Sequence, residues 1–179
     1  IGRGVDYAAT QEASLKLKEI SYIHSEAYAA GELKHGTISL ITDNVPVIAL
    51  ATQPDVYAKI ISNVQEVRSR GAKVILITGA DASVDAALCD YHIVLPETDP
   101  LFAPFVATVI LQYLAYYVSV EKGLNVEVGT VGCVGTCYLE PIVDVYEDNG
   151  DRTKTLSSCF SPVYYLLIFY LLDTDVLAL

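Results

Sequence analysis

Residues 12–36 read Glu-Ala-Ser-Leu-Lys-Leu-Lys-Glu-Ile-Ser-Tyr-Ile-His-Ser-Glu-Ala-Tyr-Ala-Ala-Gly-Glu-Leu-Lys-His-Gly and form the densest run of ionisable side chains in the sequence. Glu12, Lys16 and Glu19 follow one another at i, i+4 and i+7, so a helix would place all three on one face. An apolar stripe repeats at similar spacing on another face, at Ala9, Ala13, Leu17 and Ile20. The stretch therefore predicts a helix with a charged face and a packed face.

The charged face has two interpretations that spacing alone leaves open. A carboxylate beside an ammonium is commonly a surface ion pair, and it can also be a tuned acid–base group. His24 and His35, two of the three histidines in the chain, follow within the next turns, and Gly31 and Gly36 enclose Glu-Leu-Lys-His. Spacing alone favours the surface ion pair, and this concentration of imidazole, carboxylate and ammonium groups weakens that preference.

Short apolar runs alternate with helical patterns over the first 123 residues. The runs at 46–51, 73–78 and 91–95 fit buried parallel strands. Residues 1–4, Ile-Gly-Arg-Gly, read as the last residue of a further strand and its turn, so the chain is expected to start within an element. The alternation predicts an α/β fold, a doubly wound three-layer sandwich with a parallel sheet. Ligands in such folds sit at the carboxyl ends of the strands.

Three helices are expected between and around these strands. The first covers 7–23, with Asp6 as its N-cap. The second runs from 54 to 70, with Gly71 following it. The third extends over 99–123 and starts at an Asp-Pro pair. It is apolar nearly all round and long enough to span a bilayer, but the surrounding strand–helix alternation favours a buried core helix.

Composition excludes several classes of function. Hydrophobic residues make up 53% of the chain and charged residues 18%, which favours a sizeable core over disorder. The formal charge of -11 argues against a nucleic-acid partner, because phosphates would be repelled. No signal-peptide pattern is present, and the four cysteines do not form a disulfide framework. A cytoplasmic protein with no membrane partner is therefore expected.

The run from residue 12 to residue 37 closely resembles the isomerase part of the glutamine–fructose-6-phosphate aminotransferase (glucosamine-6-phosphate synthase) family, and more narrowly its second sugar-isomerase (SIS) domain. The resemblance covers residues 1–126. It includes the further motifs Gly2-Arg3-Gly4, Pro46-Val-Ile-Ala-Leu-Ala, Ser62-Asn63, Glu66-Val67 and Leu114-Ala-Tyr-Tyr. Related SIS proteins lack the pair Lys-Glu-Ile-Ser-Tyr-Ile-His and Gly-Glu-Leu-Lys-His-Gly, so the resemblance is specific.

The resemblance implies a role for each charged residue in converting fructose 6-phosphate and ammonia to glucosamine 6-phosphate. Glu19 is implied as the base that takes the proton from carbon 1, and Lys16 as the group that orients it and stabilises charge. His35 is implied as the ring-opening residue acting on the neighbouring subunit, so a homodimer is expected. Glu12 is implied as a supporting substrate contact. The implied partner is a sugar phosphate, with no cofactor, and Glu19 needs partial desolvation to be an effective base.

Parts of that enzyme find no match in this sequence. A glutaminase domain, the phosphate loop of the first SIS domain and the C-terminal lysine loop are not recognised. The expectation is a chain with the proton-transfer residues but little or no turnover alone. A non-catalytic sugar-phosphate-binding SIS module is the alternative. His24 and His92 are interpreted as structural histidines.

Residues 127–179 are expected to form an unrelated or chimeric tail. Residues 128–145 resemble the second half of a thioredoxin-like two-iron ferredoxin, in which Cys133 and Cys137 would supply half of a four-thiolate set. The second pair is absent, because Cys89 stands alone upstream. No metal site is therefore expected unless an iron–sulfur centre is completed elsewhere, and an electron-transfer module is the less favoured alternative.

Overall fold

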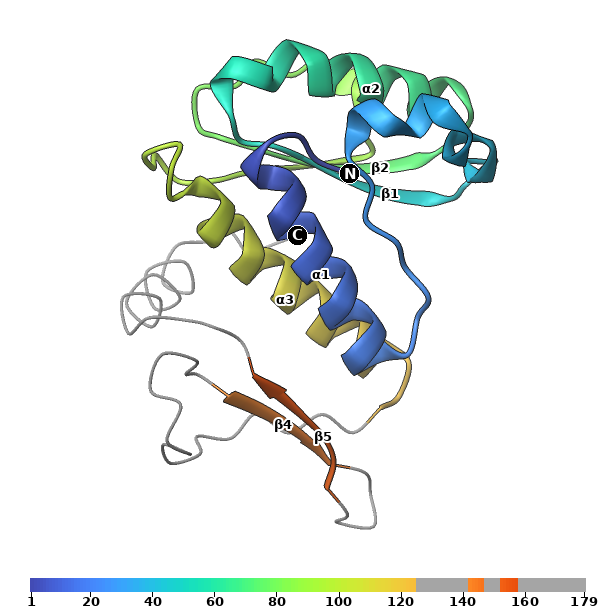
Figure 1. Ribbon diagram of the computed structural model, residues 1–179, viewed down its shortest axis with the longest axis vertical. Coiled ribbons are helices and arrows are strands. Elements are labelled where there is room, and N and C mark those ends of the chain that lie inside the picture. The colour runs from blue at the N-terminus through green and yellow to red at the C-terminus, as the bar shows by residue number, and fades with distance from the viewer. Residues whose placement is uncertain (125–141, 147–151, 158–179) are drawn as a thin grey trace. The chain divides into compact units, whose positions relative to one another are not determined.

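The computed structural model of the protein describes residues 1–124, 142–146 and 152–157 (Figure 1). One compact unit contains Ile1–Leu15 and Ser25–Leu111, and a second contains Lys16–His24 and the chain from Gln112 onward. The boundary expected near residue 126 and the thiols of Cys133 and Cys137 lie outside the described residues.

A parallel sheet is the centre of the first unit. It consists of β1 (Pro46–Ala51), β2 (Lys73–Thr78) and β3 (Tyr91–Val94), in that order. Both pairings are parallel, with Pro46 opposite Lys73 and Ile75 opposite Tyr91. The strands lie within one residue of the runs predicted from sequence, so the predicted α/β fold with a parallel sheet is confirmed.

The first two residues extend this sheet beyond β1. The Ile1 amino group donates to Ile48 O at 2.6 Å, and Leu50 N donates to Ile1 O at 3.0 Å. This is the bonding pattern of a parallel pair. Gly2 forms a further parallel bridge with Ala29. The interpretation of residues 1–4 as a strand end and its turn is therefore correct.

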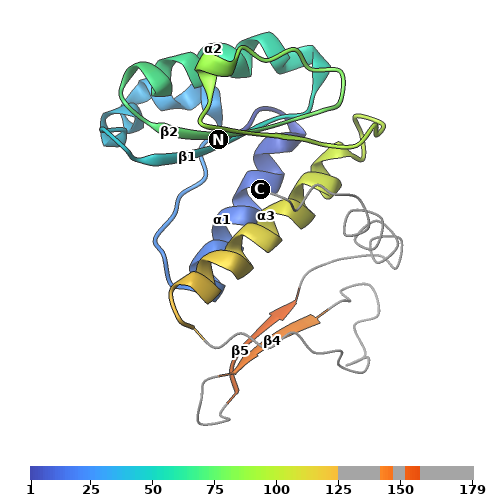
Figure 2. The ribbon, with the colours of Figure 1, turned by 180° about the vertical axis from the view of Figure 1, so that it is seen from behind.

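Helix α2 (Tyr57–Ser69) covers one face of the sheet, lying along β1 and β2 in both views (Figures 1 and 2). Its apolar stripe recurs every three to four residues, which is the period of a packed helix face. The core beneath it combines side chains of α2, the strands and the short helix η1 (Ala30–His35): Ala30, Leu33, Val47, Ala49, Val64, Val67, Val74 and Leu76. This core fixes η1 against the sheet.

Helix α1 (Val5–Ser21) starts two residues earlier than predicted. Asp6 is therefore inside the first turn, and the prediction that it caps the helix is wrong. Its carboxylate accepts hydrogen bonds from Thr52 N at 2.8 Å and Thr52 Oγ1 at 2.6 Å. Asp6 is 1% exposed, and burial raises the pKa of its carboxyl group. The acid thus ties the start of α1 to the carboxyl end of β1.

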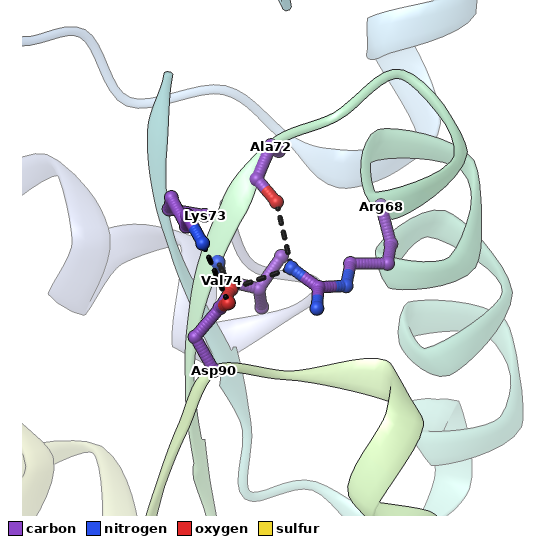
Figure 3. A network of polar contacts seen from close by, with 5 residues as sticks. All are labelled: Arg68, Ala72, Lys73, Val74 and Asp90. Carbon is purple, nitrogen blue, oxygen red and sulfur yellow. Dashed lines mark hydrogen bonds and ion pairs between the residues drawn. The ribbon is translucent and has the colours of Figure 1, made fainter. Parts of the chain in front are cut away.

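Polar contacts around Asp90 hold the amino ends of β2 and β3 together (Figure 3). Asp90 Oδ2 accepts from Val74 N at 2.8 Å and from Arg68 Nη1 at 2.6 Å, and Oδ1 accepts from Lys73 Nζ at 3.3 Å. The Val74 N–H, together with the two cations, holds the pKa of Asp90 below its ordinary value. The network fixes the register of the short edge strand β3.

Helix α3 (Ala103–Glu121) begins four residues after Asp99, later than predicted. Asp99 Oδ1 accepts from Leu101 N at 2.8 Å, and its carbonyl accepts from Ala103 N at 3.0 Å. Asp99 therefore holds the turn at residues 100–102 that precedes α3, and the prediction that the helix starts at the Asp-Pro pair is wrong. Among the described residues, α3 is long and apolar enough to cross a bilayer, and half of its most apolar window is buried within the protein. The other half is not buried and includes the exposed side chains of Phe105, Tyr117 and Val120, so the prediction of a buried core helix is met only in part.

The second unit also contains a hairpin. Strand β4 (Ile142–Tyr146) pairs antiparallel with β5 (Arg152–Ser157), and the register shifts between Val145 and Tyr146.

Candidate active site

Lys16 and Glu19 form the central pair of the candidate site. Lys16 Nζ lies 3.3 Å from Glu19 Oε2, in an i,i+3 contact on α1. The Lys16 side chain is 6% exposed, whereas the Glu19 side chain is 32% exposed. A buried ammonium is stable only when it is paired and hydrogen-bonded. The lysine is thus the fixed partner, and the carboxylate is the group that solvent or a ligand can reach.

The last turn of α1, which carries Glu19, is held by three hydrogen bonds at Ser21 that the sequence did not reveal. Ser21 Oγ donates to Leu17 O at 2.6 Å and accepts from Ile23 N at 3.3 Å. Lys122 Nζ donates to Ser21 O at 2.5 Å, a bond across 101 residues of sequence. The helix then stops at Tyr22, whose φ is 56°. These contacts fix the end of α1 two residues after Glu19.

A pair of serines in the first unit bonds the segment that follows α1 back to that helix. Ser14 Oγ donates to Ser25 O at 2.9 Å, and Ser25 Oγ donates to Ser14 O at 2.9 Å. Ser14 is 9% exposed. Reciprocal hydroxyl–carbonyl bonds of this kind fix the path of the segment that leads from α1 to η1.

Glu12 and His35 belong to the first unit and are described there separately from Lys16 and Glu19. Glu12 is half-buried on α1 and has interactions of its own. His35 is the last residue of η1 and its side chain is 74% exposed, with Nε2 3.9 Å from Glu32 Oε2. The structure therefore brings Lys16 and Glu19 together and leaves the imidazole of His35 accessible at a surface.

Thr37 follows that imidazole at the start of the short helix η2 (Thr37–Leu40). Its Oγ1 atom is buried and has no hydrogen-bond partner among the described residues. A buried hydroxyl without a partner costs about 1–3 kcal/mol of stability. This cost falls at the turn that ends η1, where Gly36 has a φ of 134°.

Three other residues considered in the sequence have ordinary surroundings. His92 Nε2 lies 2.9 Å from Thr78 Oγ1, a contact that agrees with a structural histidine, and burial lowers its pKa. His24 is exposed and has interactions of its own. Cys89 is half-buried, and burial raises the pKa of its thiol. Within residues 1–124 and the two described strands of the tail, no group of three or more His, Cys, Asp or Glu side chains could hold a metal ion.

A parallel sheet covered by helices, with α1 starting at the carboxyl end of β1, is the α/β architecture of a sugar-isomerase domain. The chain belongs to the SIS domain family, whose model matches residues 1–122.

Its relatives within that class are glutamine–fructose-6-phosphate aminotransferases (isomerizing). The protein of that name from Symbiobacterium thermophilum is 54% identical over 127 residues, which are 71% of this chain and 21% of the relative. One from Sphingobium yanoikuyae is 51% identical over 128 residues, covering 71% of this chain and 82% of the relative. The resemblance inferred from the sequence is thereby confirmed.

A solved structure shows the same relationship. The C-terminal domain of glucosamine-fructose-6-phosphate aminotransferase from Francisella tularensis superimposes with a TM-score of 0.63 and 43% sequence identity, covering 69% of this chain and 35% of that chain. The chain spans about a fifth of the length of most of the curated relatives it matches.

Proposed function

We propose that this chain is the isomerase portion of a glutamine–fructose-6-phosphate aminotransferase and moves a proton between carbons 1 and 2 of an imine of fructose 6-phosphate. The observation that carries the proposal is the Lys16–Glu19 pair, with its buried ammonium and its partly exposed carboxylate. A base that is reachable by substrate and held beside a fixed cation suits the removal of a carbon-bound proton.

Glu19 acts as the base in this scheme. Ammonia replaces the carbonyl oxygen at carbon 2 with loss of water, and the imine nitrogen takes up a proton from solvent. Glu19 then takes a proton from carbon 1, which leaves an enaminol. Return of that proton to carbon 2, with release to solvent of the hydroxyl proton on carbon 1, gives the open-chain form of glucosamine 6-phosphate. The Lys16 ammonium, 3.3 Å from the carboxylate, orients it and stabilises the negative charge that develops.

His35 opens the sugar ring in this scheme and acts on the site of a second copy of the chain. Its exposure supports this role, because an imidazole that is 74% exposed at the end of η1 can be reached by another protein molecule. An imidazole exchanges protons near neutral pH, as ring opening requires. Glu12 supports the substrate contact on the same helix as the base. A homodimer is part of the proposal.

Net turnover by this chain alone is proposed to be low. The test is to incubate the purified chain with fructose 6-phosphate and ammonium and to quantify glucosamine 6-phosphate. Trace product that depends on Glu19 supports the proposal, and robust product formation contradicts its low-turnover part. Activity that is unchanged in Glu19→Gln would instead favour a sugar-phosphate-binding module that does not use this carboxylate. Glu97→Gln, an exposed loop carboxylate, is the matched control.

A further inference from the structure

Helix η1 needs outside support to hold the side chain at its end in one position. It is a six-residue 3-10 helix that ends in the exposed imidazole of His35. Such helices have poor hydrogen-bond geometry and rarely persist beyond three or four residues without outside support. Buried Ala30 and Leu33 anchor one side of η1 in the core, at 0% and 1% exposed. Apolar contacts are not directional, so these two anchors alone do not fix the rotation of η1 about its own axis.

The first support lies at Gly31, where the guanidinium of Arg3 approaches closely. A β-carbon at Gly31 would lie 3.0 Å from Arg3 Nη2 and 3.2 Å from Nη1. Arg3 Nε donates to Asn63 Oδ1 at 3.0 Å, so α2 holds the guanidinium in place. Asn63 is 3% exposed and Arg3 is half-buried, so this directional bond is partly buried.

The second polar support lies at Lys34, next to the histidine. Lys34 Nζ is 2.6 Å from Glu66 Oε1. Glu66 Oε2 also accepts from Asn63 Nδ2 at 3.4 Å. Asn63 and Glu66 are three residues apart on α2 and therefore share one face of that helix. The two supports of η1 thus meet in one connected set of side chains, the polar clamp, made of Arg3, Lys34, Asn63 and Glu66.

We propose that the polar clamp fixes the rotation of η1 about its own axis and so positions the imidazole of His35 for ring opening. This inference rests on the proposed function. Arg3, Lys34, Asn63 and Glu66 are positioning residues, because they act through His35 and the backbone of η1. A displacement of about 1 Å in a reacting group can cost on the order of 10²-fold in rate. A network that supports an exposed catalytic side chain therefore contributes more to the reaction rate than to the free energy of unfolding.

The clamp predicts a result that a simple ion pair does not. Lys34 is 61% exposed, and an exposed pair contributes only about 0–1 kcal/mol to stability. Breaking the Lys34–Glu66 ion pair should leave the free energy of unfolding nearly unchanged. The position of His35 should nevertheless change, because Glu66 joins Lys34 to the buried Asn63.

The test uses the full chain labelled for NMR, with Glu66→Ala, the charge swap Lys34→Glu with Glu66→Lys, and Gln65→Ala as an exposed control on α2. In Glu66→Ala, the imidazole signals of His35 should shift, and amide exchange in residues 32–35 should accelerate about tenfold at an unchanged urea midpoint. The swap restores the ion pair but not the bond from Asn63, because a lysine at position 66 cannot accept it, so both readouts should stay changed. Gln65→Ala should match the parent chain. Unmoved His35 signals in Glu66→Ala, or full recovery in the swap, would overturn the clamp.

Ring opening separates this inference from the proposed function. The rate of exchange between the anomers of fructose 6-phosphate, followed by NMR, should fall in His35→Ala and fall by about tenfold in Glu66→Ala and in the swap. If His35→Ala loses ring opening and Glu66→Ala keeps it, the clamp fails and the proposed role of His35 stands. If His35→Ala keeps the parent rate, the role of His35 fails, and the positioning inference fails with it.

Discussion

The ammonium of Lys16 lies 3.3 Å from the carboxylate of Glu19, and the lysine is almost fully buried whereas the glutamate is about one-third exposed. The difference in exposure separates the two roles. A buried cation cannot move without losing its pairing, while a carboxylate at the surface can turn toward a substrate. The pair therefore supplies a fixed positive charge and a reachable base.

Lys16→Met should lower any Glu19-dependent proton exchange by about 10- to 100-fold, because the developing negative charge loses its nearest cation. Stability should change by less than about 1 kcal/mol, since methionine fills a similar volume and leaves no buried charge unpaired. Enzyme assays combined with urea unfolding would measure both quantities. Lys18→Met, an exposed lysine on the same helix, is the control and should change neither. A large loss of stability with unchanged exchange would mean that Lys16 has only a structural role.

Asp6→Asn should remove a pH dependence of stability. Burial raises the pKa of Asp6 above its ordinary value of 3.8, so the folded state binds this proton more tightly than the unfolded state. Stability from this group is therefore present below 3.8 and is lost as the pH rises through the raised pKa. The asparagine variant should have a flatter profile of urea midpoint against pH above 3.8 and should be at least as stable as the parent at the upper end.

Asp6→Ala distinguishes the charge from the hydrogen bonds. It removes both contacts to Thr52 and should cost about 1–3 kcal/mol in acid, because the donors remain buried, and the cost should fall as the pH rises through the raised pKa of Asp6. An asparagine variant that keeps the parent's pH slope would show that Asp6 is not the titrating group.

Asp90→Asn should act in the opposite direction on the pH scale. The pKa of Asp90 is held below 3.8, chiefly by the Val74 N–H and then by Lys73 and Arg68. Its stabilising effect is therefore complete above 3.8 and is lost as the pH falls through the lowered pKa. The variant should have a lower urea midpoint at pH 7, and the gap should close in acid. Asp81→Asn, an exposed loop residue, should show no such gap.

Much of the fold could be predicted because local patterns dominate it. The apolar runs of β1 and β2 and the Asp99 turn before α3 are each specified by a few neighbouring residues. The cap assigned to Asp6 was wrong because its partner, Thr52, lies 46 residues away, and no local signal indicates that pairing. Tertiary burial changed the role of that acid.

The candidate site shows the same division. Lys16 and Glu19 could be paired from helical spacing alone, and the resemblance supplied their proposed roles. Arg3 and Asn63 are 60 residues apart, and Ser21 and Lys122 are 101 residues apart. Contacts of that range require the folded chain, so the supports around the site emerged only from the structure.

Thr37→Val should stabilise the protein by up to about 1 kcal/mol, because valine fills the same space and removes a buried hydroxyl that has no partner among the described residues. The urea midpoint would measure this gain. Thr42→Val, at an exposed position a few residues later, is the control and should be neutral. A destabilised Thr37→Val would show that the hydroxyl has a partner in solution, such as an ordered water.

The central claim is that Glu19 removes a proton from carbon 1 of the sugar phosphate. Its most direct measurement is deuterium incorporation at carbon 1 of fructose 6-phosphate in D₂O containing ammonium, followed by NMR for the parent chain, Glu19→Gln and the control Glu97→Gln. The account predicts slow incorporation with the parent and the control and a loss of about 100-fold or more in Glu19→Gln, the scale of a lost general base. Equal incorporation by Glu19→Gln and the parent chain would contradict it.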